Sequence, residues 1–158
     1  MAKGVKVSIK DIDRGFKKFK KSAKFVAKEK PFVKAGILES SGQHSDSDLT
    51  VAAVATFHEF GTERTPPRSF FRKMQEEQRQ NIRNFILNLQ DSVILRPDQA
   101  LGLLGTFLVD LLKKQVDKTN DPPLHPRTIS EKGSTKPLID TGQMRNSIQY
   151  EVKKGGSE

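Results

Sequence analysis

The fold is decided by residues 69–118, which read SFFRKMQEEQRQNIRNFILNLQDSVILRPDQALGLLGTFLVDLLKKQVDK. Apolar residues recur through this stretch at steps of three and four, which is the spacing of one face of an α-helix. Pro97 interrupts the pattern, and Asp98 after it is a residue type that caps helix N-termini. The stretch therefore predicts two long helices, with Asp98 as the N-cap of the second. Their apolar positions are Phe70, Met74, Ile82, Phe85, Ile86, Leu89 and Val93 and then Leu101, Leu104, Leu108, Leu111, Leu112 and Val116.

Short alternating segments flank these helices on both sides. Every second residue is apolar in residues 33–37 and again in residues 148–152. This alternation is typical of strands that bury one face. We therefore predict an α+β domain in which three to four helices pack on a small, mostly antiparallel sheet that includes residues 32–38 and 147–153.

Residues 50–60, between the first strand and the first long helix, allow two interpretations. Valine, threonine and phenylalanine favour a strand, yet Val54, Ala55 and His58 share one helical face. We favour a short helix that ends at Gly61, a residue type suited to helix C-caps.

The region after the second long helix contains a connector and two short helical turns. Residues 120–126 are rich in proline and predict a non-helical connector. Two later patterns resemble capping boxes. In a capping box, one side chain and a second side chain three residues later each accept a hydrogen bond from a free backbone amide. They are Thr128 with Glu131, and Asp140 with Gln143.

The positive charge is concentrated at the N-terminus. The 158 residues carry a net charge of +9 and include no cysteine, which excludes disulfides and thiolate metal ligands. Residues 1–34 hold eleven lysines and Arg14 against three acidic residues, so the remaining chain is neutral overall. Such a concentrated field suits a polyanion or an acidic partner surface. A lysine-coated solvent face of a helix is the alternative.

The basic segment itself, residues 1–30, predicts an amphipathic helix that starts near Ser8 and stops at Pro31. Its apolar side includes Phe16 and Phe19, which we assign to the core rather than to stacking on nucleic-acid bases. The lysines of the opposite side are candidate contacts for DNA or for a partner protein. They are Lys17, Lys18, Lys20, Lys21 and Lys24.

The length of the chain fits one domain. In this domain, residues 1–30 form the basic helix or an arm, residues 31–154 form the α+β body, and residues 155–158 are expected to fray. The N-terminus lacks an apolar stretch of signal-peptide length, and no run of about 18 uncharged apolar residues occurs. We expect neither export by a signal peptide nor a membrane partner.

Patterns for metal binding are weak. His58 and Glu59 begin like a zinc-protease motif, but Thr62 stands where the second histidine ligand would lie. His44 and His125 can approach His58 only through tertiary folding. Scattered histidines are more often surface or hydrogen-bonded residues than metal ligands.

Patterns for catalysis are weaker still. Residues 131–136 contain the letters of a phosphate-binding loop in the wrong order. The sequence has no nucleophile elbow and no paired carboxylates in a context that would raise one pKa. We therefore predict no catalytic, cofactor-binding or metal site, and we do not expect an enzyme.

Two stretches carry a resemblance to a known family. Residues 54–71 read VATFHEFGTERTPPRSFF, and residues 124–148 read LHPRTISEKGSTKPLIDTGQMRNSI. They resemble the minor tail protein Z and related tail-completion and neck proteins of long-tailed bacteriophages. That family shows an acidic-Phe-Gly-Thr turn, a Pro-Arg-x-Phe segment and a closing Leu-Ile-Asp-Thr-Gly-x-Leu/Met-Arg-x-Ser-Ile element. The matching residues are Glu59, Phe60, Gly61, Thr62, Pro67, Arg68, Phe70, Asp140, Thr141, Gly142, Arg145 and Ser147.

The resemblance spans about residues 36–152 and implies a structural virion protein without a cofactor. Such proteins act at the head-proximal end of the tail, beside tail tube or tail terminator proteins and head connector proteins. The resemblance also implies a homo-oligomeric ring, non-specific contact with genomic DNA in the channel, and assembly in the host cytoplasm. A tail terminator or head-tail connector ring protein is the alternative within this class. A non-specific DNA-binding protein is the alternative from another class.

The physical interpretation of the matching residues favours maintenance of the fold over direct partner contact. Gly61 supplies a positive φ after the short helix. We expect Arg68 to offer its planar guanidinium to the Glu59 carboxylate. We also expect Asp140 to cap a turn that points Arg145 outward, with Met144 directed inward.

Overall fold

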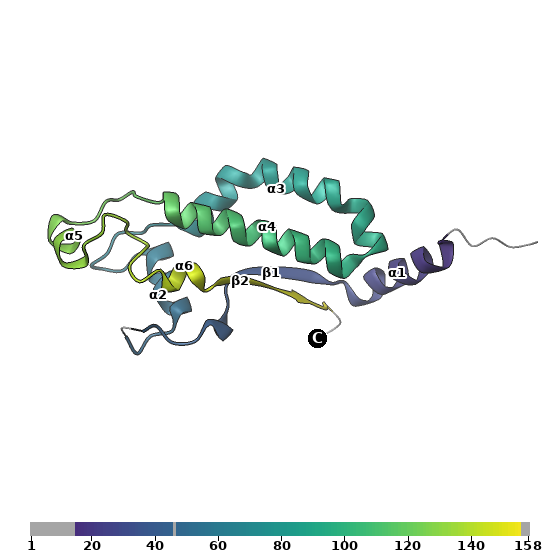
Figure 1. The fold of residues 1–158 in the computed structure, drawn as a ribbon, viewed down its shortest axis with the longest axis horizontal. Coiled ribbons are helices and arrows are strands. Elements are labelled where there is room, and N and C mark those ends of the chain that lie inside the picture. The colour runs from purple at the N-terminus through teal and green to yellow at the C-terminus, as the bar shows by residue number, and fades with distance from the viewer. Residues whose placement is uncertain (1–14, 46, 156–158) are drawn as a thin grey trace, which may run out of the picture.

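A helical hairpin forms one layer of the molecule. The computed structural model describes residues 15–45 and 47–155. Within them, α3 (Phe70–Leu95) and α4 (Pro97–Lys118) lie side by side (Figure 1). The prediction of two long helices is confirmed. Their apolar faces meet, and the rings of Phe85 and Phe107 stack with centroids 4.1 Å apart.

The second long helix begins two residues earlier than predicted. Pro97 occupies its first turn, and Arg96 precedes it at the N-cap position. The assignment of Asp98 as the N-cap is therefore wrong. Proline is well suited to this place because its φ is already helical and the first helical turn needs no N–H donor.

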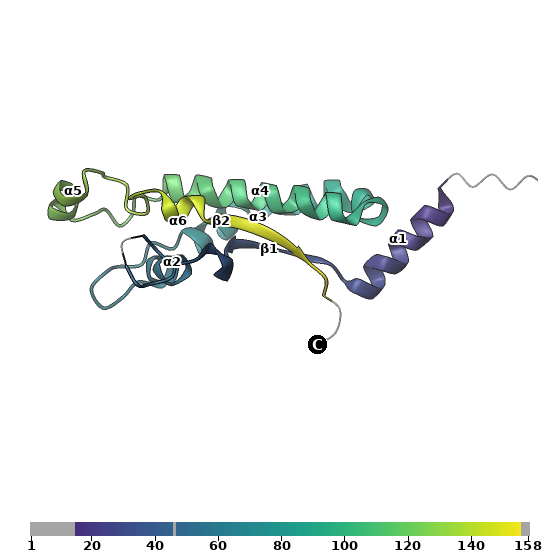
Figure 2. The ribbon, with the colours of Figure 1, turned by 60° about the horizontal axis from the view of Figure 1, so that its bottom comes forward.

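A two-stranded sheet forms the second layer, beneath the hairpin (Figure 2). Strands β1 (Phe32–Ile37) and β2 (Ile148–Lys153) pair antiparallel in one continuous register. Helix α4 packs on this sheet, and Gly105 makes the close approach feasible because any Cβ there would collide with the Tyr150 ring. The predicted α+β class is confirmed.

The core gathers at one end of the hairpin. There α2 (Val51–Phe60) and α6 (Gln143–Asn146) pack near the start of α3 and the last turns of α4. Helix α2 confirms the helical interpretation of residues 50–60, with Thr50 Oγ1 accepting a hydrogen bond from the backbone amide of Ala53. The core cluster, defined by its buried residues, is Val51, Ala55, Phe70, Met74, Leu112, Val116, Leu138, Met144 and Ile148.

Helix α1 (Phe16–Glu29) projects from the opposite end of the molecule (Figure 2). The predicted start near Ser8 lies outside the described residues. No residue of α1 is buried, and Phe16 and Phe19 are 67% and 41% exposed. Their assignment to the core is wrong, because periodicity shows which side chains share a face but not whether another element covers it.

The short elements depart from their predicted caps. Helix α5 (Pro126–Lys132) begins before Thr128, and His125 Nδ1 accepts a hydrogen bond from the amide of Arg127. Pro126 at the first helical position explains this start. At α6 the N-cap is Gly142 rather than Asp140. Both predicted capping boxes are therefore wrong.

Three further features complete the described chain. A 3₁₀ turn, η1 (Glu39–Ser41), follows β1. Gly155 lies against the Lys30 carbonyl, and the rest of the segment predicted to fray lies outside the described residues. No described helix is long and apolar enough to span a membrane.

Candidate functional site

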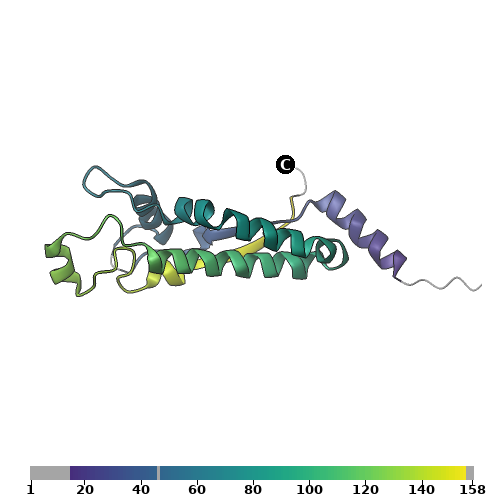
Figure 3. The ribbon, with the colours of Figure 1, turned by 90° about the horizontal axis from the view of Figure 1, so that it is seen from above.

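The two motif stretches meet at the end of the molecule opposite α1. Residues 54–71 supply α2 and the loop that leads into α3, and residues 124–148 supply α5, α6 and the segment between them. Figure 3 shows these segments side by side, although the whole hairpin separates them in sequence. Between them lies a cleft of about 800 Å³, here named the motif cleft. Its lining includes His44, Val54, His58, Arg64, Arg68, Leu124, His125, Lys132, Leu138, Asp140, Thr141 and Met144.

Arg68 holds the connector that forms one wall of this cleft. Its side chain is only 5% exposed, its Nε donates to the Pro122 carbonyl at 2.8 Å, and its Nη2 donates to the Pro123 carbonyl at 3.1 Å. The predicted pairing of Arg68 with Glu59 is therefore wrong. Burial lowers the pKa of Arg68 from its ordinary value, but a guanidinium still keeps its charge at neutral pH.

Glu59 instead stabilises the start of α3. Its two carboxylate oxygens accept hydrogen bonds from the backbone amides of Phe71, at 2.9 Å, and Arg72, at 3.0 Å. The Ser69 hydroxyl donates to the Glu59 carbonyl at 2.7 Å. The first amides of a helix have no partner within the helix, and a negative charge there also interacts favourably with the helix dipole. Glu59 thus joins the end of α2 to the start of α3.

The loop between these helices is tightly folded. Gly61 has a φ of 78°, as predicted, and a Cβ at this position would lie 2.9 Å from the backbone nitrogen of Pro67. Thr62 Oγ1 accepts a hydrogen bond from the amide of Thr65 at 3.1 Å. Phe70, at the far side of the loop, is buried in the core cluster, whereas Phe60 is 66% exposed. Most of this first motif therefore serves the fold.

The closing motif forms the opposite wall of the cleft. The Thr141 hydroxyl accepts a hydrogen bond from the amide of Gln143 at 3.3 Å, and Gly142 has a φ of 80°. Met144 is buried, as predicted, and the Ser147 carbonyl accepts a hydrogen bond from the Ser41 hydroxyl. These contacts fix the turn that leads into β2.

Arg145 is bound to α4 rather than directed freely outward. Its Nε and Nη2 donate to the two carboxylate oxygens of Asp117 at 2.6 and 2.8 Å. This bidentate hydrogen bonding lowers the pKa of Asp117 and raises the pKa of Arg145. The pair ties the closing motif to the last turn of α4.

Lys132 and Asp140 add charges of opposite sign to the cleft. The Lys132 ammonium donates to the carbonyls of Lys136, at 3.0 Å, and Pro137, at 3.4 Å. Burial lowers the pKa of Lys132, the charge of Asp140 opposes this change, and the charge of Arg68 adds to it. Asp140 is exposed at the surface of the cleft and does not cap α6.

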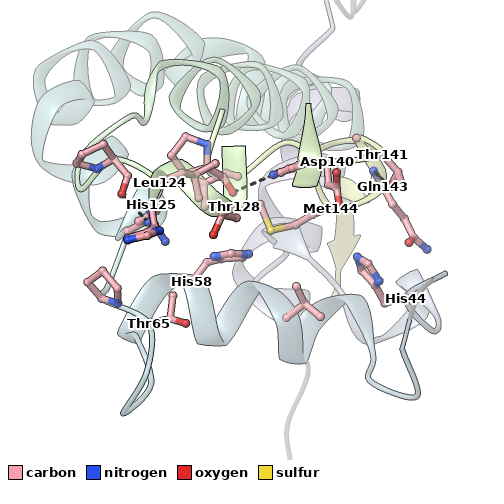
Figure 4. A pocket seen from close by; sticks show the side chains of 18 of the residues that line it. His44, His58, Thr65, Leu124, His125, Thr128, Asp140, Thr141, Gln143 and Met144 are labelled. Atoms are coloured by element: carbon pink, nitrogen blue, oxygen red, sulfur yellow. Dashed lines mark hydrogen bonds between the residues drawn. The ribbon is translucent and has the colours of Figure 1, made fainter. Parts of the chain in front are cut away.

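Tertiary folding brings the three histidines around one cleft. Figure 4 shows His58 on the cleft side of α2, with His44, His125 and Met144 around the same space. Burial lowers the pKa of His58, and the charges of Arg68, Lys132 and His44 lower it further. His58 is therefore neutral at pH 7, and its buried Nδ1 has no hydrogen-bond partner within the described part of the chain.

The described residues do not arrange these histidines as a metal centre. No group of three or more histidine, aspartate or glutamate side chains among residues 15–45 and 47–155 is placed to hold a metal ion. A neutral imidazole offers one hydrogen-bond donor and one acceptor, one on each ring nitrogen.

The candidate lysines of α1 lie far from the motif cleft. All five are exposed on the projecting helix, at the other end of the molecule (Figure 3). The structure therefore does not bring them together with the motif residues. They are Lys17, Lys18, Lys20, Lys21 and Lys24.

Sequence reasoning missed Lys132 and Asp117 as partners in this region. Asp117 belongs to no local pattern that marks it, and its partner Arg145 lies 28 residues away along the chain. The partner carbonyls of Lys132 are only four and five residues away, but no sequence pattern marks a lysine that donates to carbonyls. Comparison with known proteins supplies no further assignment: no family model, curated protein or solved structure matches this chain.

Proposed function

We propose that the protein is a structural component of a long-tailed bacteriophage particle. It acts at the head-proximal end of the tail, where it completes the tail and enables the head to join. Two features support the proposal: the order and chemistry of the motif residues resemble those of tail-completion proteins, and the two motif stretches fold onto one end of the domain.

The observation that carries the proposal is that the charged side chains of the motif bind other segments of the same chain. Arg68 holds the connector carbonyls, Glu59 holds the start of α3, and Arg145 holds Asp117. Each of these charged groups positions another segment of the chain. A rigid surface of this kind favours binding by shape and charge, so the proposal assigns neither turnover nor a cofactor.

The proposed partners are tail tube or tail terminator proteins on one side and head connector proteins on the other. Helix α1 supports an assembled state, because its aromatic residues Phe16 and Phe19 are exposed in the single chain. In a homo-oligomeric ring, several copies of α1 would gather their lysines near one channel or one acidic neighbour.

The test is complementation of tails that lack this protein. Light scattering at two concentrations gives the mass of the purified chain with and without such tails. We expect stoichiometric binding to tail ends and recovery of head joining. A chain that ignores the tails and leaves head joining unrestored would overturn the proposal.

A tail terminator or head-tail connector ring protein is the alternative within the same class. This alternative predicts a stable ring of this chain in the absence of tails. The mass measured by light scattering without tails distinguishes it from a completion protein that assembles only on the tail.

A non-specific DNA-binding protein is the second candidate, and the exposed lysines of α1 favour it. Contacts between lysines and phosphates are independent of sequence and weaken steeply with salt. This candidate predicts tight, salt-sensitive binding of duplex DNA by the monomer. Completion of tails predicts weak DNA binding until the protein is assembled.

A further inference from the structure

The motif cleft contains a buried positive charge without a carboxylate partner. Charged side chains are rarely fully buried unless they are paired. Arg68 is 5% exposed, and the two hydrogen bonds described for it go to neutral carbonyls and use two of its five N–H donors. None of the ion pairs in the described part of the chain includes Arg68.

Lys132, which is half-buried, adds a second cation to the same cleft. Its ammonium also donates to neutral carbonyls, those of Lys136 and Pro137. Asp140 is the only carboxylate among the residues described as lining the cleft, and it stands exposed. Arg64, which is exposed on the loop between α2 and α3, also lines the cleft. Its lining therefore includes more cationic side chains than carboxylates.

The remaining walls of the cleft are largely apolar. Val54, Leu138 and Met144 line it, and Leu138 and Met144 belong to the buried core cluster. The buried Nδ1 of His58 adds one hydrogen-bonding atom that no described residue satisfies. A complementary ligand therefore combines a negative group with an apolar part and one polar atom.

We propose that the motif cleft is the docking site for an acidic peptide segment of a partner protein. A carboxylate of that segment pairs with Arg68 and Lys132, and a neighbouring apolar side chain packs on Leu138 and Met144. Guanidinium groups bind carboxylates through two parallel hydrogen bonds, which gives such a contact direction as well as strength. In the assembled particle the partner is a neighbouring virion protein, and this assignment rests on the proposed function.

The composition of the cleft favours a peptide over a nucleic-acid backbone. Phosphate sites in proteins commonly use several backbone amides from a helix N-terminus or a glycine-rich loop. The connector and the loop at this cleft are instead built from Pro66, Pro123 and Pro126, which have no N–H to donate. The lysines suited to phosphates stand on α1, at the other end of the molecule.

The experiment is an NMR titration of the ¹⁵N-labelled full chain with short blocked peptides. The probe peptide carries one glutamate between two leucines, and its twin carries glutamine instead. We expect the glutamate peptide to shift the amide signals of His58, Thr65, Thr141 and Met144. The glutamine peptide should bind about tenfold more weakly, because its amide keeps one acceptor oxygen but loses the negative charge and the second acceptor oxygen. Equal binding of the two peptides, or no shift by either, would overturn the proposal.

Two variants locate the binding site. Lys132→Gln should weaken binding of the glutamate peptide severalfold, while the control Lys114→Gln, at an exposed lysine outside the cleft, should not. Because Lys132 also holds two carbonyls, Arg64→Gln at the exposed loop provides a second test if the first variant unfolds. Unchanged affinity in the folded variants would contradict the site.

Two further titrations separate the source of the negative charge. Inorganic phosphate and a short DNA duplex are added to the same labelled chain. If either shifts the cleft amides more strongly than the glutamate peptide does, the peptide assignment is wrong. If the chain does not bind the glutamate peptide but still restores head joining, only this inference is refuted. If the chain binds the peptide but does not bind tails, only the proposed function is refuted.

Discussion

The end of the molecule that contains the motif cleft, here named the motif end, and helix α1 both carry basic side chains, but in different surroundings. At the motif end, Arg68 is 5% exposed and is fixed by two carbonyls, and Arg145 is fixed by both oxygens of Asp117. On α1 the candidate lysines are exposed, and no residue of the helix is buried. Positively charged side chains thus stabilise the fold at the motif end, whereas those on α1 stay accessible to partners.

The same contrast applies to the apolar side chains. The core cluster lies at the motif end and includes Leu112, which is 1% exposed, whereas Phe16 on α1 is 67% exposed. Loss of a buried side chain costs stability, while loss of an exposed one affects only what binds there. Substitutions in the two regions should therefore differ most in their effect on unfolding.

Truncation of Leu112 is expected to have the largest effect. Leu112→Ala leaves a cavity in the core cluster and lowers the free energy of unfolding by about 2–5 kcal/mol. The matched change on α1, Phe16→Ala, removes a larger side chain but should change this free energy by less than about 0.5 kcal/mol. Urea unfolding followed by circular dichroism measures both. Similar losses in the two variants would contradict the placement of the core.

Removal of the Arg68 guanidinium ranks second. Arg68→Leu leaves the carbonyls of Pro122 and Pro123 without their charged donor, so we expect a loss of about 2–3 kcal/mol in the free energy of unfolding. Arg79→Leu, at an exposed position of α3, is the control and should stay within about 0.5 kcal/mol of the parent. A parent-like unfolding curve for Arg68→Leu would show that the connector is held by other contacts.

Glu59 should contribute less, because it caps a helix end. Glu59→Ala removes the acceptor of two α3 amides and is expected to cost about 1 kcal/mol. Glu63→Ala, at an exposed position of the adjacent loop, is the matched control. The losses from Glu59→Ala and Arg68→Leu should add in the double variant, since the two side chains have separate partners. A loss in the double variant that differs strongly from the sum of the two single losses would support the ion pair between Glu59 and Arg68 that the sequence predicts.

The Asp117–Arg145 pair gives a smaller, pH-dependent effect. The folded state lowers the pKa of Asp117 below its ordinary value of 3.8, mainly through the hydrogen bonds from Arg145. The pair therefore stabilises the fold above about pH 4, and this contribution is lost as the pH falls through the lowered pKa. Both side chains are about a third or more exposed, so Arg145→Met should cost less than about 1 kcal/mol at pH 7.

Urea unfolding of Arg145→Met and the parent at pH 7 and at about pH 2 tests this dependence. The difference between them should shrink as the pH falls toward the lowered pKa of Asp117, because protonation of the carboxyl removes its interaction with Arg145. The control Arg127→Met removes an ion pair that is more exposed and should show a smaller difference at pH 7. A difference that grows on acidification would reverse the expected sign.

Neutralisation of the α1 lysines should have the smallest effect on stability. Replacement of all five by glutamine is expected to change the free energy of unfolding by less than about 0.5 kcal/mol, because surface substitutions seldom matter more. Tail completion and DNA retention should nevertheless fall. Thermal unfolding and complementation of deficient tails measure the two outcomes, and unaltered assembly would remove α1 from the proposed interface. The five residues are Lys17, Lys18, Lys20, Lys21 and Lys24.

The secondary structure was predictable because its signals are local. The 3.6-residue period of residues 69–118 and the alternation near both ends of the domain require only neighbouring side chains. The positive φ of Gly61 is likewise a property of one turn. The starts of the short helices were less predictable. Helix α5 begins at Pro126, before the cap expected at Thr128, and α6 has Gly142 at its N-cap in place of Asp140.

The sequence by itself determined the α+β class, the long helices, the paired strands and the concentration of charge at the N-terminus. Only the tertiary structure decided that Phe16 lies in solvent, that Arg68 binds carbonyls 54 and 55 residues away, and that three histidines share a cleft. Periodicity fixes which residues share a face, because it follows from backbone geometry. The partner of that face depends on contacts between distant segments, which form only when the hairpin, the sheet and the motif end pack together.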